Sequence, residues 1–79
     1  NSQSKYEQAL IYSKKSLRIK KQIGDKKEIA KSLGNIGNVY YEQGNYEDAL
    51  LNYNNSLNIS KEIGDKNGIA ASLNNIGII

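Results

Sequence analysis

Apolar residues recur at helical spacing in the middle of the chain. They stand at i, i+4, i+7 and i+11, and the positions are Ile29, Leu33, Ile36 and Tyr40. Residues at this spacing lie on one face of a helix with about 3.6 residues per turn. A second apolar set follows a few residues later and comprises Tyr46, Ala49, Leu50, Tyr53 and Leu57. The pattern predicts two helices that pack together through these faces.

The same pattern occurs twice, at an offset of forty residues. A shift by forty superimposes Tyr6 on Tyr46 and Leu17 on Leu57, and it does so without any insertion. Roughly half of the overlapping positions are identical, which is the signature of stacked structural repeats. The repeat predicts four helices, at about residues 5–22, 27–43, 46–62 and 66–79.

Glycine and a polar residue mark each predicted corner between helices. The long corners are Gly24-Asp25 and Gly64-Asp65, and the short corner is Gly44-Asn45. Glycine allows the left-handed conformation that ends a helix, and Asp or Asn accepts backbone N–H bonds at the next helix start. Asp25 and Glu28 have the spacing of a capping box. Asn45 is expected to cap the third helix.

Gly37 lies in the middle of a predicted helix, beside the apolar stripe. Glycine there costs about 1 kcal/mol of helix stability relative to alanine. A steric reason accounts for this cost: we expect the third helix to cross so closely that a side chain at position 37 would hold it away. The small Ala49 is expected to lie opposite.

These residues form a recognisable motif. Its members are Leu33, Ile36, Gly37, Tyr40, Gly44, Tyr46, Ala49, Tyr53 and Ser56. The motif resembles the tetratricopeptide repeat, and the resemblance extends over the whole chain. It differs at Leu33, Ser56 and Lys61, where the family commonly has Trp, Ala and Pro. The period is forty rather than about 34 residues, which is similar to the repeats of kinesin light chains.

The resemblance implies an all-α fold, a right-handed α-α superhelix with four helices in about two repeats. Residues 1–79 would then form one segment with a partial repeat at 1–25, a complete repeat at 26–65 and a partial repeat at 66–79. We expect this segment to belong to a longer array.

A polar stripe lies opposite the apolar stripe of the second helix. It comprises Lys31, Asn35, Asn38 and Glu42, and the equivalent positions of the last helix are Ala71, Asn75 and Ile78. The resemblance places the first helix of each repeat along a concave groove, where Asn35 and Asn75 would lie side by side. Because a carboxamide both donates and accepts hydrogen bonds, this pair can hold the backbone of an extended peptide.

The candidate peptide-binding groove therefore comprises Lys31, Gly34, Asn35, Asn38, Tyr41, Glu42, Asn74, Asn75 and Ile78. An alternative stays open, because asparagine is frequent along the whole chain, including the third helix. In that interpretation the polar stripe is only the solvated face of a helix.

Composition narrows the possible functions. The chain has no cysteine and no histidine, which excludes disulfides and thiolate metal sites and removes the commonest general base. No catalytic constellation or phosphate-binding loop is present, so we expect neither an enzyme nor a bound cofactor or metal. No apolar run approaches the roughly 20 residues of a membrane-spanning helix, so we expect a soluble, cytoplasmic chain.

Charge is distributed unevenly. Residues 1–31 hold nine cations and three acids, a net charge of +6, whereas residues 32–79 hold two cations and five acids, a net charge of −3. Lys14, Arg18 and Lys21 share one face of the first helix and are able to attract nucleic acid without sequence preference. Such a face is more often simply solvated.

Three functions are therefore considered. The first is a protein–protein interaction scaffold that binds an extended peptide or a partner helix in the groove. The second is a structural segment that associates head to tail through its uncapped ends into a homo-oligomer. The third, which we do not expect, is weak binding of nucleic acid.

Overall fold

Four helices follow one another in residues 2–79, the part of the chain that the computed structural model describes. They are α1 (Ser2–Ile23), α2 (Lys26–Glu42), α3 (Tyr46–Ile63) and α4 (Lys66–Gly77). The helix bounds agree with the predicted ones to within three residues, and the all-α prediction is confirmed. Asn1, the first residue of the predicted partial repeat 1–25, lies outside the described residues.

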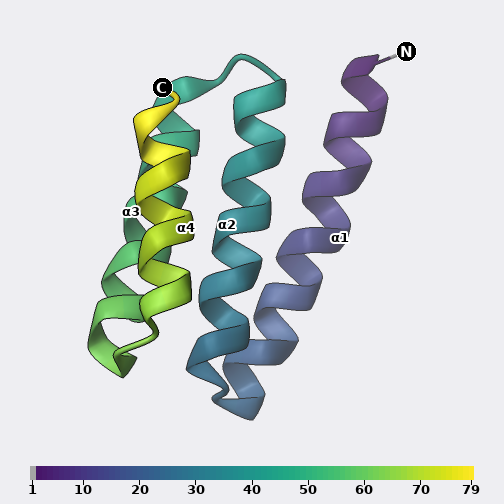
Figure 1. Ribbon diagram of the computed structural model, residues 1–79. Helices are drawn as coiled ribbons and strands as arrows, with labels where there is room; N and C mark the ends of the chain where they lie inside the picture. Colours follow the sequence, from purple (N-terminus) through teal and green to yellow (C-terminus); the bar gives the residue numbers. More distant parts are fainter. Residues whose placement is uncertain (1) are drawn as a thin grey trace.

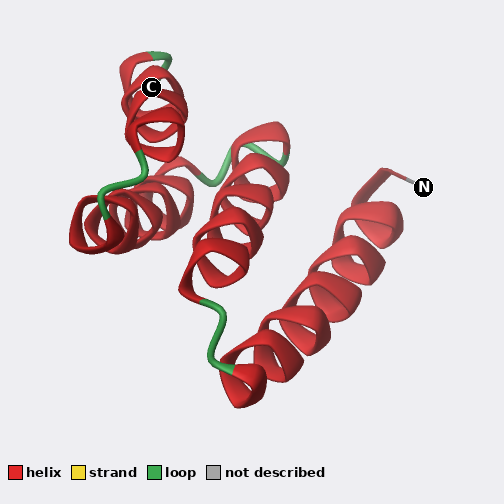
Figure 2. Cartoon of the chain, turned by 60° about the horizontal axis from the view of Figure 1, so that its bottom comes forward, coloured by secondary structure: helices red, strands yellow, loops and turns green. Residues whose placement is uncertain are grey.

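The helices form a flat, staggered array with α2 at its centre (Figures 1 and 2). Its extents are 39 × 29 × 16 Å. Each helix contacts the next one along the chain, and α2 also contacts α4. Figure 1 shows that α2 and α4 run in the same direction, as expected for the first helices of successive repeats. Four helices are too few to trace a superhelical turn, so the right-handed superhelix stays a prediction.

The core lies mainly where α2 packs on α3. Its buried apolar residues are Ala30, Leu33, Ile36, Ala49, Tyr53 and Leu57. These positions confirm that the two predicted apolar stripes face each other. Tyr46 is an exception, because 51% of it is exposed. It is the first residue of α3, directly after the corner, and its ring packs on that of Tyr41 with a centroid separation of 5.5 Å.

Gly37 is the point of closest approach between α2 and α3. A Cβ atom at this position would lie 2.6 Å from Cε1 of Tyr53 and 3.3 Å from the carbonyl oxygen of Ala49. Both neighbours are fully buried. The predicted reason for this glycine is confirmed: the absence of a side chain makes room for the Tyr53 ring.

Glycine ends each helix that precedes a corner. Gly24, Gly44 and Gly64 have positive φ angles of 83°, 82° and 70°. After the second of these, the Asn45 N–H donates to the carbonyl of Tyr40 at 2.8 Å, as in a Schellman motif. The corners thus satisfy backbone carbonyls that the helix ends would leave without partners.

The predicted side-chain caps are only partly present. Asp25 Oδ1 accepts a hydrogen bond from the Glu28 N–H at 3.3 Å, whereas the Glu28 carboxylate pairs with Lys20 at 3.4 Å, so the capping box is half formed. The cap predicted at Asn45 is wrong. Asn45 stands at the N-cap position of α3, but its Oδ1 accepts no cap bond. Its Nδ2 donates to Asp48 Oδ2 at 2.7 Å, and this charge-assisted bond orients the amide. Asp65 likewise makes no side-chain cap bond.

We predict that Gly37→Ala destabilises the chain and that Gly77→Ala does not. The new methyl group at position 37 must displace the buried Tyr53 ring, and such overpacking costs about 1–3 kcal/mol, more than the gain of about 1 kcal/mol in helix propensity. At Gly77 a Cβ would meet no atom within 4 Å. Urea denaturation followed by circular dichroism measures both effects. Equal or greater stability of Gly37→Ala would contradict the close crossing.

Candidate functional site

A groove of about 520 Å³ lies between α2 and α4. Residues from three helices and one corner line it: Lys27, Ala30, Lys31, Gly34, Asn35 and Asn38 from α2, Ser56 and Ser60 from α3, and Asp65, Asn67, Gly68, Ala71, Ser72 and Asn75 from the last corner and α4. None of these side chains is a large apolar one. The groove has small residues at its buried positions, whereas amide and charged groups and the small Ala71 stand at its exposed positions.

The structure brings together five of the nine predicted groove residues. Lys31, Gly34, Asn35, Asn38 and Asn75 line the groove. The other four, which do not, are Tyr41, Glu42, Asn74 and Ile78. The Tyr41 ring packs on Tyr46 at the α2–α3 corner, and Glu42 is exposed at the end of α2. Asn74 is exposed on α4, and Ile78 is exposed directly after it. Contact of any of the nine with a partner stays a prediction.

Asn35 and Asn75 line the groove from opposite helices. Asn35 is exposed on α2, and its equivalent forty residues later, Asn75, is half-buried on α4. Each amide is able to donate and to accept a hydrogen bond. The amides of Asn35 and Asn75, which are equivalent positions of the forty-residue repeat, are therefore both available to a ligand in this groove.

Asn38 connects the groove to the core. Tyr53 OH donates to Asn38 Oδ1 at 2.6 Å. This bond uses one lone pair of the amide oxygen, so the NH₂ group and the second lone pair of Asn38 remain to serve a groove ligand. Burial raises the pKa of the Tyr53 hydroxyl, and the nearby Tyr41 and Glu42 side chains raise this pKa further.

Serines form part of the groove floor, a role that the sequence analysis missed. Ser56 Oγ donates to the carbonyl oxygen of Ala30 at 2.8 Å, and Ser72 Oγ donates to Ser56 Oγ at 3.4 Å. These bonds connect α2, α3 and α4. The signal was present in the sequence, because Ser16 and Ser32 precede Ser56 and Ser72 by forty residues.

One end of the groove is charged. Lys27 and Lys31 are exposed there on α2, and the half-buried Asp65 lies on the other side. Lys31 Nζ is 3.9 Å from a carboxylate oxygen of Glu28, with both side chains substantially exposed. An ion pair of this kind contributes little to stability, so the lysine stays available to an acidic ligand.

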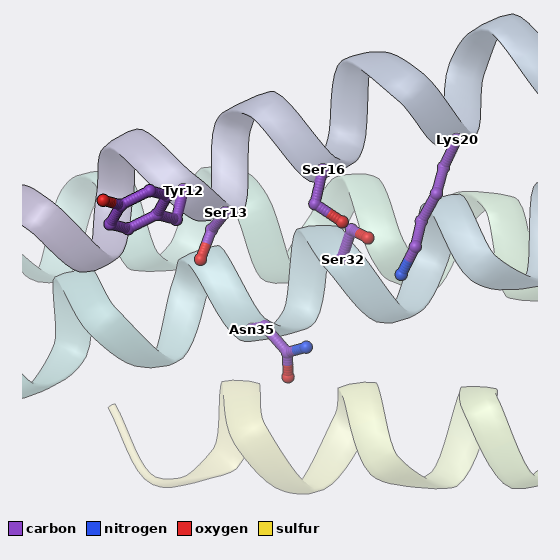
Figure 3. Close-up of a pocket in the computed structure, with 6 residues that line it drawn as sticks. All are labelled: Tyr12, Ser13, Ser16, Lys20, Ser32 and Asn35. Atoms are coloured by element: carbon purple, nitrogen blue, oxygen red, sulfur yellow. The ribbon is translucent and has the colours of Figure 1, made fainter.

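A smaller hollow of about 220 Å³ lies between α1 and α2. It is lined by Tyr12, Ser13, Ser16, Lys20, Ser32 and Asn35. Figure 3 shows Ser16 and Lys20 pointing from α1 toward α2. Four of its residues are repeat equivalents of groove residues, since Ser16, Lys20, Ser32 and Asn35 correspond to Ser56, Ser60, Ser72 and Asn75. The hollow thus resembles part of the groove, and Asn35 lines both.

We predict that Tyr53→Phe lowers the free energy of unfolding by about 1 kcal/mol near neutral pH, the net contribution of one hydrogen bond. The pH dependence also changes. Because the pKa of Tyr53 is raised in the folded state, its hydroxyl stabilises the fold fully below about pH 10, and this stabilisation is lost as the pH rises through the folded-state pKa.

Urea denaturation at neutral pH and above about pH 10 tests both statements. Tyr53→Phe should lose less stability on alkalinisation than the unmodified chain does. Tyr12→Phe is the control, since 69% of Tyr12 is exposed. An identical alkaline loss in all three proteins would exclude Tyr53 as its source.

Comparison with known protein families places the chain among its relatives. The tetratricopeptide repeat matches residues 1–62 and again residues 28–79, two overlapping spans that together cover the chain. A search of curated proteins gave no significant match. Repeats of this kind are in general non-catalytic protein–protein interaction modules. The kinesin light chain-like subtype stays a prediction.

In residues 2–79 no helix combines the length and the hydrophobicity needed to cross a bilayer. Since the family motif, the helix-crossing glycine and the end-to-end match agree, the chain belongs to the tetratricopeptide repeat family.

Proposed function

We propose that the groove between α2 and α4 binds an extended segment of a partner protein. The supporting observation is the combination of amides and small residues in one groove. Asn35 and Asn75 supply the amides, and Ala30, Gly34 and Ala71 lie between and beside them. Small side chains allow a peptide backbone to come close, and the amides then pair with its N–H and C=O groups.

The lining favours an extended peptide over a partner helix. A helix with its side chains is about 10–12 Å wide, and it is usually held by apolar anchors in a hydrophobic groove. The groove offers no large apolar side chain among the residues that line it. Hydrogen bonds to the ligand backbone are thus the interaction that this lining supports best.

The charged end of the groove adds a preference for an acidic side chain in the ligand. Lys27 and Lys31 are exposed there, within a stretch whose net charge is +6. Salt should weaken this part of the binding, because the charges are exposed to solvent.

The nucleic-acid alternative gains no comparable support. That alternative requires three cations, and one of them, Lys14, already has a partner within the chain. Its Nζ lies 5.6 Å from the centroid of the Tyr40 ring. Cytoplasmic localisation stays a prediction.

We predict that Asn35→Ala and Asn75→Ala each weaken peptide binding by about three- to ten-fold, the effect of losing one hydrogen bond. The probe is a peptide selected by the chain from a phage-displayed library of random sequences, and fluorescence anisotropy measures its affinity. Asn58→Ala is the matched control, because Asn58 is an exposed asparagine on α3 that lies outside the groove.

Binding should therefore depend on the position of the asparagine and not merely on its removal. Unchanged affinity in both groove variants, or an equal loss in Asn58→Ala, would contradict the proposed site. Recovery of helical apolar peptides alone would contradict the proposed ligand class.

A further inference from the structure

The starts of α2 and α4 differ in sequence, although they are equivalent positions of the forty-residue repeat. An aspartate precedes each helix, but Lys27-Glu28 of α2 is replaced by Asn67-Gly68 in α4. Among the asparagines of the chain, Asn67 alone is followed by glycine. An asparagine loses its side-chain amide most readily in this context, because glycine has no side chain to hinder the attack of its own backbone nitrogen on the preceding carboxamide.

The backbone nitrogen of Gly68 is not held by a cap. In α2, Asp25 Oδ1 accepts a hydrogen bond from the equivalent N–H, that of Glu28, at 3.3 Å. In α4, Asp65 makes no such bond. The first backbone bond that α4 donates comes one residue later, from the Ile69 N–H to the Asp65 carbonyl at 2.9 Å. The Gly68 N–H is therefore one of the donors that a helix start leaves without an intrahelical partner.

The missing side chain at Gly68 accounts for this difference between the two caps. A Cβ atom at position 68 would lie 2.8 Å from Asp65 Oδ2 and 2.6 Å from Ser60 Oγ. The Asp65 carboxylate thus lies in space that a side chain at position 68 would need. It is half-buried there, whereas Asp25 is exposed. One substitution, glutamate by glycine, consequently creates the reactive dipeptide and leaves its nitrogen uncapped.

The carboxamide of Asn67 is accessible to water. Asn67 is exposed and lines the groove between α2 and α4. It is the second residue of α4, and the ends of helices fray. Fraying matters because a helical ψ angle keeps the Gly68 nitrogen away from Asn67 Cγ, and the opening of one turn brings these two atoms together.

We propose that Asn67 is a site of spontaneous deamidation, a modification that changes the charge of the groove. The Gly68 nitrogen forms a bond to Asn67 Cγ, and the side-chain nitrogen leaves as ammonia with the proton of the Gly68 N–H. The product is a five-membered succinimide ring. Water then opens the ring at Cγ to give aspartate, or at the main-chain carbonyl to give isoaspartate. Water is the only co-reactant, and nothing is oxidised or reduced.

The new carboxylate removes the excess positive charge of the groove. The charged residues that line it are Lys27, Lys31 and Asp65, so two cations face one acid before the reaction and two acids after it. Figure 1 shows that α2 and α4 begin at the same end of the array. Negative charge is favourable at the start of a helix, so the aspartate product keeps α4 intact. The attraction of the groove for an acidic ligand decreases.

Peptide mapping by mass spectrometry tests the reaction. The full chain is held at neutral pH with and without urea, and fragmentation locates each asparagine that has become an acid. We predict that Asn67 of the folded chain reacts at least about ten-fold faster than Asn58, because the branched Ile59 hinders attack on Asn58. Asn58 is also exposed, which makes it the matched control. Asn67→Gln should lose the signal, because a longer side chain closes the ring more slowly.

Two results of this experiment would overturn the inference. One is a rate at Asn67 that does not exceed the rate at Asn58. The other is reaction of Asn67 in urea but not in the folded chain, which would show that the first turn of α4 protects the carboxamide.

A second experiment measures the effect on the groove, which rests on the proposed function, whereas the reaction itself does not. The probe is a peptide from the phage-displayed library that contains Asp or Glu, and fluorescence anisotropy measures its affinity. We predict that Asn67→Asp weakens binding by about two- to five-fold, the effect of one exposed charge, and that Asn58→Asp has no effect. High salt should abolish the difference.

Storage links the two experiments. The affinity of the unmodified chain should fall in step with the deamidated fraction, and Asn67→Gln should hold its starting affinity. Deamidation of Asn67 with equal affinities of Asn67→Asp and Asn58→Asp would overturn the effect on the groove. Failure of every variant to bind a library peptide would overturn the proposed function together with this effect, while the mass spectra would still decide the reaction.

Discussion

The close contact between Gly37 and the Tyr53 ring is the constraint on which the other features depend. The Tyr53 ring fills the space that a side chain at position 37 would occupy, and it thereby sets the separation of α2 and α3. As a result, Tyr53 is completely buried. The hydroxyl of the same ring then reaches Asn38 on the outer surface of α2. One tyrosine thus fixes the helix crossing and also orients an amide of the groove. Stability and the shape of the groove are consequently coupled at this residue.

The groove itself results from the parallel placement of α2 and α4. Ser56 lies between these helices and bonds to Ala30 in α2, while Ser72 of α4 bonds to Ser56. Because the serine side chains at this junction are small, the three helices come close together. The serine hydroxyl groups also have hydrogen-bond partners there. Where the family commonly has alanine, serine adds a hydrogen bond in addition to being small. Each unsatisfied buried hydroxyl would otherwise cost about 1–3 kcal/mol.

Most of the fold was predictable because it depends on local patterns. The apolar stripe that includes Leu33 and Ile36 has a clear helical period, and mid-helix Gly37 has a cost that only a close neighbour explains. Features at the helix ends were less predictable. Asn45 had two possible partners for its side chain, and Tyr46 had the spacing of a core residue but stands beside the corner. Such outcomes depend on neighbours that periodicity does not describe. For the same reason, Asn35 lines the groove between α2 and α4, while Tyr41 packs on Tyr46 at the corner.

The equivalent positions of α2 and α4 differ in how much they vary. Core positions such as Leu33 and Ile36 recur as Leu73 and Ile76, whereas the exposed positions Lys31 and Asn38 are replaced by Ala71 and Ile78. Substitutions at exposed positions disturb packing little. The scaffold is therefore evolvable at its surface: a repeat is able to acquire a new specificity without a compensating change in its core. Asn38 is the exception, because a change there also removes the acceptor for Tyr53.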